Sequence, residues 1–119
     1  MNAVGFAAVG AGAAIGAWLR WALGLGLNAL LPNLPLGTLA ANLMGGFLIG
    51  VVVELFTLHP VVPPEVRLFV ITGFLGGLTT FSTFSAEAVG LLAKRELGWA
   101  LAHIGAHLLT SLLLTGVGI

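Results

Sequence analysis

Four apolar stretches, each bounded by prolines or charged residues, account for most of this chain. A helix needs roughly 20 apolar residues to cross the hydrocarbon layer of a membrane, and all four stretches reach that length. The expected spans cover residues 4–28, 36–56, 66–93 and 99–118. We therefore expect an all-α membrane protein with a single four-span domain, residues 1–119, and with both termini on one side.

The composition supports a lipid environment. Hydrophobic residues make up 59% of the 119 residues and charged residues 7%, and the mean hydropathy is +1.15. A soluble domain of this size has too much surface for its volume to bury that much apolar material. The absence of cysteine excludes disulfides and thiolate chemistry, and without a basic run nucleic acid is not an expected partner.

The orientation in the membrane is left open by the charges. Arg20, Lys94 and Arg95 fall towards one side of the expected bundle and Arg67 towards the other. Basic residues near span ends orient membrane proteins, but a bias of three to one is weak. One fixed orientation and insertion in both orientations are equally compatible with this pattern.

Small residues recur at four-residue spacing in the first two spans. The chain has 18 glycines. Two of the pairs spaced four residues apart are Gly12 with Gly16 and Gly46 with Gly50. This spacing lets helix backbones approach closely in lipid. Four helices form a bundle too small for a pore of its own, so we expect tight packing within the bundle and also between copies of the chain.

The third span contains a segment that is poorly suited to a helix. Gly76 and Gly77 precede a run rich in serine and threonine that ends near Glu87. A helix break in a membrane is tolerated only where the freed backbone groups are buried in protein or line a wet cavity or ion site. We expect a break near mid-membrane. The alternative is a continuous helix whose hydroxyls bond back to its own carbonyls.

Polar side chains also lie inside the other spans. Asn42 must find hydrogen-bond partners, and Glu87 is a functional candidate because it is ionisable within a span; a structural, hydrogen-bonded carboxyl is its alternative role. His103, His107 and Ser111 share one helix face. Two histidines four apart can chelate a metal, but no third ligand is evident nearby in the sequence. We therefore expect a polar track facing protein or water.

Two strings of residues resemble the Fluc (CrcB) fluoride channels. They are GTLAANLMG at residues 37–45 and GFLGGLTTFSTFS at residues 73–85. Chain length, four spans and an arginine late in the first span extend the resemblance over nearly the whole chain. The resemblance implies a fluoride-selective ion channel, not an enzyme, that confers fluoride resistance. It also implies an antiparallel, dual-topology homodimer with two pores in the plasma (inner) membrane of a prokaryote, surrounded by lipid.

The resemblance assigns a fluoride path to particular residues. Phe81 and Phe84 match a pair of phenylalanines lining that path, where positive ring edges attract an anion weakly enough for release. Asn42 matches a pore asparagine whose amide can donate to fluoride. The remaining side chains assigned to this path are Ser82, Thr83, Ser85, Ser111 and His107.

A cation site and a vestibule are implied in the same way. Backbone carbonyls of Gly76 and Thr79 from both subunits would hold a structural Na⁺ at the dimer interface, with no organic cofactor. Arg20 would lie near a vestibule and draw anions in, although a snorkelling or helix-end contact is an alternative role. The other polar residues assigned to the pore exit and vestibule are Glu87, Thr38 and His103.

The two histidines depart from the resemblance, since hydroxyl-bearing side chains are expected at their positions. Histidine titrates near neutral pH, so we hypothesise that conductance depends on pH between about 5 and 8. An unchanged pH profile of fluoride flux in His107→Ser would contradict this hypothesis.

Other functions fit parts of the sequence. A small dual-topology multidrug exporter would share the length and assembly, but it depends on a first-span glutamate where this chain has Arg20 and no acid. A proton-coupled fluoride transporter would use Glu87 or the histidines as a proton relay. A structural subunit would not need the donors and rings, and no nucleophile–base pair marks an enzyme.

Overall fold

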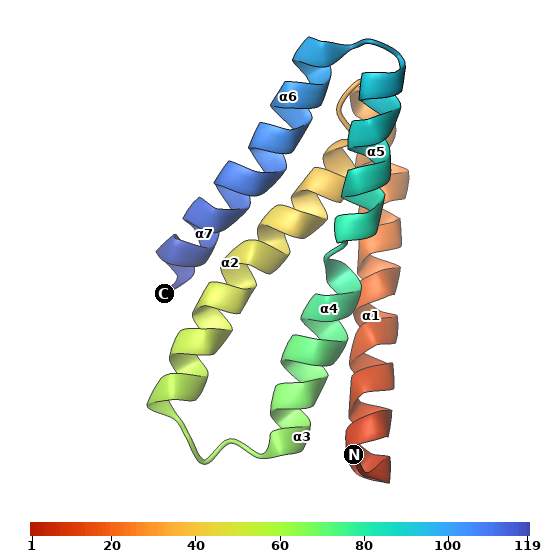
Figure 1. Cartoon of the computed structure of the whole chain (residues 1–119). Helices are drawn as coiled ribbons and strands as arrows, with labels where there is room; N and C mark the ends of the chain where they lie inside the picture. Colours follow the sequence, from red (N-terminus) through yellow and green to blue (C-terminus); the bar gives the residue numbers. More distant parts are fainter.

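The computed structural model describes all 119 residues, and every regular element in it is a helix. The chain crosses the bundle four times, alternating in direction (Figure 1). The first span is α1 (Ala3–Leu27), extended by the 3-10 turn η1 (Asn28–Leu30), and the second is α2 (Leu36–Leu58). The fourth consists of α6 (Leu97–Gly105), the π-helical η3 (Ala106–Thr110) and α7 (Ser111–Gly118).

All four spans are long and apolar enough to cross a membrane. Each begins and ends within two residues of the range expected from the sequence. Only 16 of the 119 residues are buried, so most apolar side chains face outward, as they do in a bundle solvated by lipid. The prediction of an all-α protein with four membrane-spanning helices is confirmed.

The third span is assembled from several pieces. It contains α3 (Pro64–Arg67), the π-helical η2 (Leu68–Leu75), α4 (Gly76–Leu78) and α5 (Phe81–Ala93). Between α4 and α5, Thr79 and Thr80 have extended backbones, with φ/ψ of −90°/156° and −151°/119°. We call these two residues the interruption. The Thr80 side chain then caps α5 by accepting a hydrogen bond from the Thr83 amide at 3.1 Å.

Backbone contact joins the third span to α1. A Cβ at Gly12 would overlap the Phe69 carbonyl, and a Cβ at Gly16 would overlap the Phe74 carbonyl. From the other side, Gly73 and Gly77 lie equally close to the α1 backbone. We call these four glycines the glycine seam. The small-residue spacing of α1 therefore serves packing within the chain.

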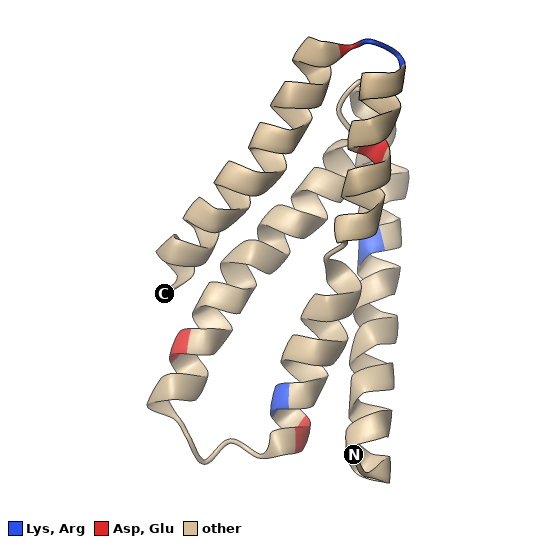
Figure 2. Cartoon of the chain, in the orientation of Figure 1, with Lys and Arg blue, Asp and Glu red and all other residues tan.

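The α2 helix packs against the fourth span in a similar manner. A Cβ at Gly50 would overlap the Thr115 carbonyl, and the Thr115 hydroxyl donates to the Gly46 carbonyl at 2.7 Å. Most charged residues lie near the ends of the helices (Figure 2). The interior of the bundle therefore contains few charges, and those it contains need specific partners.

Candidate ion-conduction site

A cavity of about 450 Å³ opens beside the interruption. Its walls come from α2, from both sides of the interruption and from the fourth span. We call it the larger cavity. The predicted site residues that line it are Asn42, Gly76, Thr79, Phe81, Phe84, His107 and Ser111. The structure therefore brings both candidate sodium positions and five of the eight candidate fluoride residues to one hollow surface. The other three, Ser82, Thr83 and Ser85, do not line it.

A smaller cavity of about 300 Å³ is lined by Arg20, Thr38 and Thr83, together with Thr80. The Arg20 Nε donates to the Gly77 carbonyl at 3.0 Å. Gly77 lies in the last turn of α4, where carbonyls lack helical partners. Arg20 thus makes the helix-end contact that the sequence left as an alternative, and its side chain also lines a cavity.

Asn42 holds the interruption in place with its side-chain amide. Its Oδ1 accepts from the Thr80 amide at 2.8 Å, and its Nδ2 donates to the Thr80 carbonyl at 3.0 Å. The same nitrogen lies 3.0 Å from Nδ1 of His107. Because an amide nitrogen has two hydrogens, both are engaged. His107 Nδ1 must then be an acceptor, and in the neutral ring the proton is on Nε2.

Aromatic rings form one wall of the site. Phe81 and Phe84 have ring centroids 5.5 Å apart at an interplanar angle of 61°, an edge-to-face arrangement. The Phe84 ring also packs against His107 at 4.6 Å and His103 at 5.3 Å. Phe81 is 79% exposed. A large ring near the middle of the third span is thus left uncovered by its own chain.

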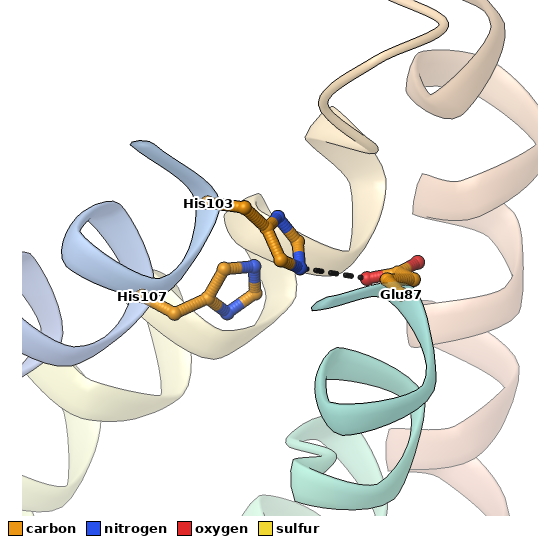
Figure 3. A group of neighbouring side chains, drawn as sticks. All are labelled: Glu87, His103 and His107. Atoms are coloured by element: carbon orange, nitrogen blue, oxygen red, sulfur yellow. Dashed lines mark ion pairs between the residues drawn. The ribbon is translucent and has the colours of Figure 1, made fainter. Parts of the chain in front are cut away.

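Glu87 from α5 meets His103 and His107 from the fourth span (Figure 3). His103 Nε2 lies 3.4 Å from Glu87 Oε1, and the other carboxylate oxygen accepts from the Thr38 hydroxyl at 2.8 Å. We call these three residues the acid–histidine cluster. No third ligand is evident near the histidines in the sequence, but folding places Glu87, which is 16 residues from His103, against them.

The carbonyl groups around the interruption divide into two sets. The Leu75 carbonyl accepts from both the amide and the hydroxyl of Thr79, while the Gly77 and Thr80 carbonyls accept from side chains. None of the hydrogen bonds outside the helices ends on the Gly76 or Thr79 carbonyl. The two carbonyls that the sequence analysis assigned to a cation are therefore free, and both residues line the larger cavity.

The hydroxyl groups predicted for the path have mixed surroundings. Ser82 is exposed, with its oxygen 3.3 Å from the Thr80 hydroxyl, Ser85 is half-buried, and Ser111 donates to the Leu108 carbonyl at 3.2 Å. Thr80 is not among the residues predicted for the site, although it is the residue that Asn42 holds. A threonine three residues before Thr83, at the start of α5, is a typical N-cap signal and could have identified it.

Four membrane-spanning helices, one interrupted beside a cavity lined by both polar and apolar side chains, are the architecture of a membrane protein that transports ions. Residues 7–119 match the family model described as "CrcB-like protein, Camphor Resistance (CrcB)". The chain belongs to this family.

Three curated relatives carry the name "Fluoride-specific ion channel FluC". The protein from Cupriavidus pinatubonensis is 60% identical over 119 residues, covering 100% of this chain and 94% of the relative. The one from Nitrosospira multiformis is 59% identical over 119 residues, covering 100% and 93%. The one from Ralstonia pickettii is 61% identical over 118 residues, covering 99% and 94%.

Proposed function

We propose that this protein is a fluoride-selective ion channel, not an enzyme, and that it lets fluoride leave the cell passively. The observation that carries the proposal is the larger cavity, where two edge-to-face phenylalanines lie beside the interruption held by Asn42. The chain belongs to the CrcB-like family, and relatives about 60% identical to it are named fluoride-specific channels.

Fluoride would move along the Phe81 and Phe84 rings. A ring edge carries partial positive charge, so it attracts an anion without a full charge. A fixed cation would bind fluoride more tightly and slow its release, whereas conduction needs binding that is easily reversed. The two ring centroids are 5.5 Å apart, so the rings would give fluoride two successive positions along the path.

Hydrogen-bond donors must replace the water that fluoride loses. Asn42 has no amide hydrogen left to offer, since both are engaged by Thr80 and His107. It acts instead through His107, whose Nε2 is buried without a partner and carries the ring proton. A buried donor without a partner is costly, and fluoride passing the Phe84 ring would satisfy it.

The working unit would be an antiparallel homodimer with two pores. A single chain leaves Phe81 exposed and the larger cavity open, so a second copy is needed to close the path. Antiparallel pairing requires insertion in both orientations, and the weak charge bias allows it. Bacterial relatives support a location in the plasma (inner) membrane, with lipid around the remaining apolar surface.

A structural Na⁺ at the dimer interface fits the free carbonyls of Gly76 and Thr79. Sodium prefers hard oxygen ligands, and carbonyls freed by a helix interruption need a partner in the membrane. When bound, the ion would join the two interruptions electrostatically. Gly77 and Thr80 would not contribute, because Arg20 and Asn42 already occupy their carbonyls.

Flux from liposomes containing the purified protein tests the channel. We expect fluoride efflux without measurable chloride efflux, and a loss of at least about tenfold in Phe81→Ile and Phe84→Ile, since each removes a ring edge from the path. Phe6→Ile is the matched control, because Phe6 is an exposed phenylalanine of α1 away from both cavities. Equal chloride passage, or full fluoride flux in both pore variants, would refute the mechanism.

A proton-coupled fluoride transporter is the second candidate, favoured by the contact between Glu87 and His103 at 3.4 Å. The two atoms form no hydrogen bond in the structure, so passing a proton would require them to approach to hydrogen-bond distance. The two functions differ when fluoride flux is measured without a pH gradient: a channel follows the fluoride gradient and the voltage alone, whereas a transporter carries protons with the anion and acidifies or alkalinises the lumen.

A further inference from the structure

We propose that Glu87, His103 and His107 form a binding site for a divalent transition-metal ion, with Zn²⁺ as the probe. One nitrogen of each ring and one carboxylate oxygen all lie within 4.8 Å of one another. Figure 3 shows the three side chains converging from α5 and the fourth span. They supply two imidazoles and one carboxylate, a ligand set suited to zinc with one coordination position open.

The spacing is already close to that of a bound site. Two ligands at about 2.0 Å from a tetrahedral zinc ion lie about 3.3 Å from each other. The His103 Nε2 and Glu87 Oε1 atoms are 3.4 Å apart, and the two imidazole rings are 4.4 Å apart between centroids. The third ligand nitrogen lies within 4.8 Å of the other two ligand atoms, so His107 would move closer to them when the ion binds.

Each of the three side chains has at least one buried polar atom without a hydrogen-bond partner. These atoms are Glu87 Oε1, both ring nitrogens of His103 and His107 Nε2. The two histidines are 0% and 4% exposed. A buried polar atom without a partner is unfavourable, and a metal ion would satisfy all three groups at once.

The surroundings support the ligands. The Thr38 hydroxyl binds the other oxygen of Glu87 at 2.8 Å and so orients Oε1 towards the rings. The Phe84 ring packs against both imidazoles and limits their rotation. Outer contacts of this kind strengthen metal sites by fixing ligand direction.

Metal binding would oppose conduction, an expectation that rests on the proposed function. His107 cannot offer the Nε2 hydrogen to fluoride and the Nε2 lone pair to a metal at the same time. Binding at Nε2 also places the ring proton on Nδ1, which then no longer accepts from Asn42. Zn²⁺ should therefore inhibit fluoride flux.

Direct binding is the first test. Purified protein treated with a chelator is titrated with Zn²⁺ by calorimetry and with Co²⁺ by visible absorption. We expect one ion per chain and intense Co²⁺ bands typical of a four- or five-coordinate site. His103→Gln and His107→Gln should each bind at least about tenfold more weakly, because losing even an outer contact costs that much.

His59→Gln is the matched control, since His59 lies in an exposed turn outside the cluster. It should bind like the unmodified protein. No saturable binding, octahedral Co²⁺ bands, or an equal loss in His59→Gln would overturn the proposal. Should the histidine variants not fold, Glu87→Gln replaces them, because its amide oxygen can still accept from Thr38.

Flux separates this inference from the proposed function. Zn²⁺ should inhibit fluoride efflux in the unmodified protein and in His59→Gln, a chelator should restore it, and His103→Gln should need at least about tenfold more Zn²⁺. If Zn²⁺ binds and flux is unaffected, the inhibitory role is refuted. If no fluoride passes even without Zn²⁺, the proposed function fails while the binding result stands.

Discussion

The two faces of the third span are held by different kinds of contact. Towards α1 it packs through the glycine seam, where the two backbones touch. On this face Arg20 of α1 donates a side-chain hydrogen bond to the third span. Towards α2 and the fourth span it meets Asn42, Thr38 and the acid–histidine cluster. One face is fixed mainly by shape and the other by hydrogen bonds, and the candidate conduction site lies on the second face.

This difference predicts two kinds of failure. Overlap in a close-packed seam cannot be relieved locally, because the opposing atoms are backbone. A single hydrogen bond between membrane helices contributes about 0.6 kcal/mol on average, with a maximum near 1.7. Substitutions in the seam should therefore abolish folding, whereas those on the polar face should change flux in a folded protein.

The largest effect is expected for Gly16→Ala. The added methyl would overlap the Phe74 carbonyl and the Leu78 amide, so the helices must separate at a cost of about 3 kcal/mol or more. We expect little folded protein by size-exclusion chromatography. Gly10→Ala is the control, since nothing lies within 4 Å of its Cβ, and it should be neutral or slightly stabilising. Normal yield and stability of Gly16→Ala would show that the seam is not close-packed.

Asn42→Ala should have the next largest effect. It leaves the Thr80 amide and carbonyl without their partner inside the bundle, at about 2–4 kcal/mol for the two groups, and it releases the His107 ring. We expect lower thermal stability together with at least a tenfold loss of fluoride flux.

Asn28→Ala provides the comparison, because Asn28 Oδ1 also accepts from two backbone amides, those of Gly37 and Thr38. It should lower stability by a similar amount and keep most of the flux. Equal flux losses in both asparagine variants would show that flux simply follows stability.

The sequence predicted the four spans because hydropathy and length depend only on local composition. It placed Asn42, Phe81 and Phe84 at one site through the resemblance of two short strings. It could not show that Glu87 meets the histidines, since that contact depends on how α5 packs against the fourth span. Nor could it show that Asn42 gives one amide hydrogen and its oxygen to Thr80 and the other hydrogen to His107, because this depends on side-chain direction.

Arg20→Met should have an intermediate effect. It removes the hydrogen bond to the Gly77 carbonyl, a loss near the upper limit of about 1.7 kcal/mol for a bond between membrane helices because the donor is charged. Arg20→Lys distinguishes a structural role from anion attraction. If charge matters, Lys restores fluoride flux at low ionic strength and less so at high ionic strength. If the helix-end contact matters, stability falls in both variants, because the guanidinium Nε is missing from each.

The smallest effect is expected for Thr38→Val. The substitution keeps the shape of a side chain that is 5% exposed and removes only the hydroxyl that donates to Glu87 at 2.8 Å. We expect a loss of about 1 kcal/mol, fully recovered in Thr38→Ser, with the protein folded throughout. Gly16→Ala adds one methyl to the seam, and Thr38→Val removes one hydroxyl from the polar face. Measuring the two variants together compares the two faces directly. If Thr38→Val prevents folding, the polar face also supports the bundle, and the division between a packing face and a conducting face does not hold.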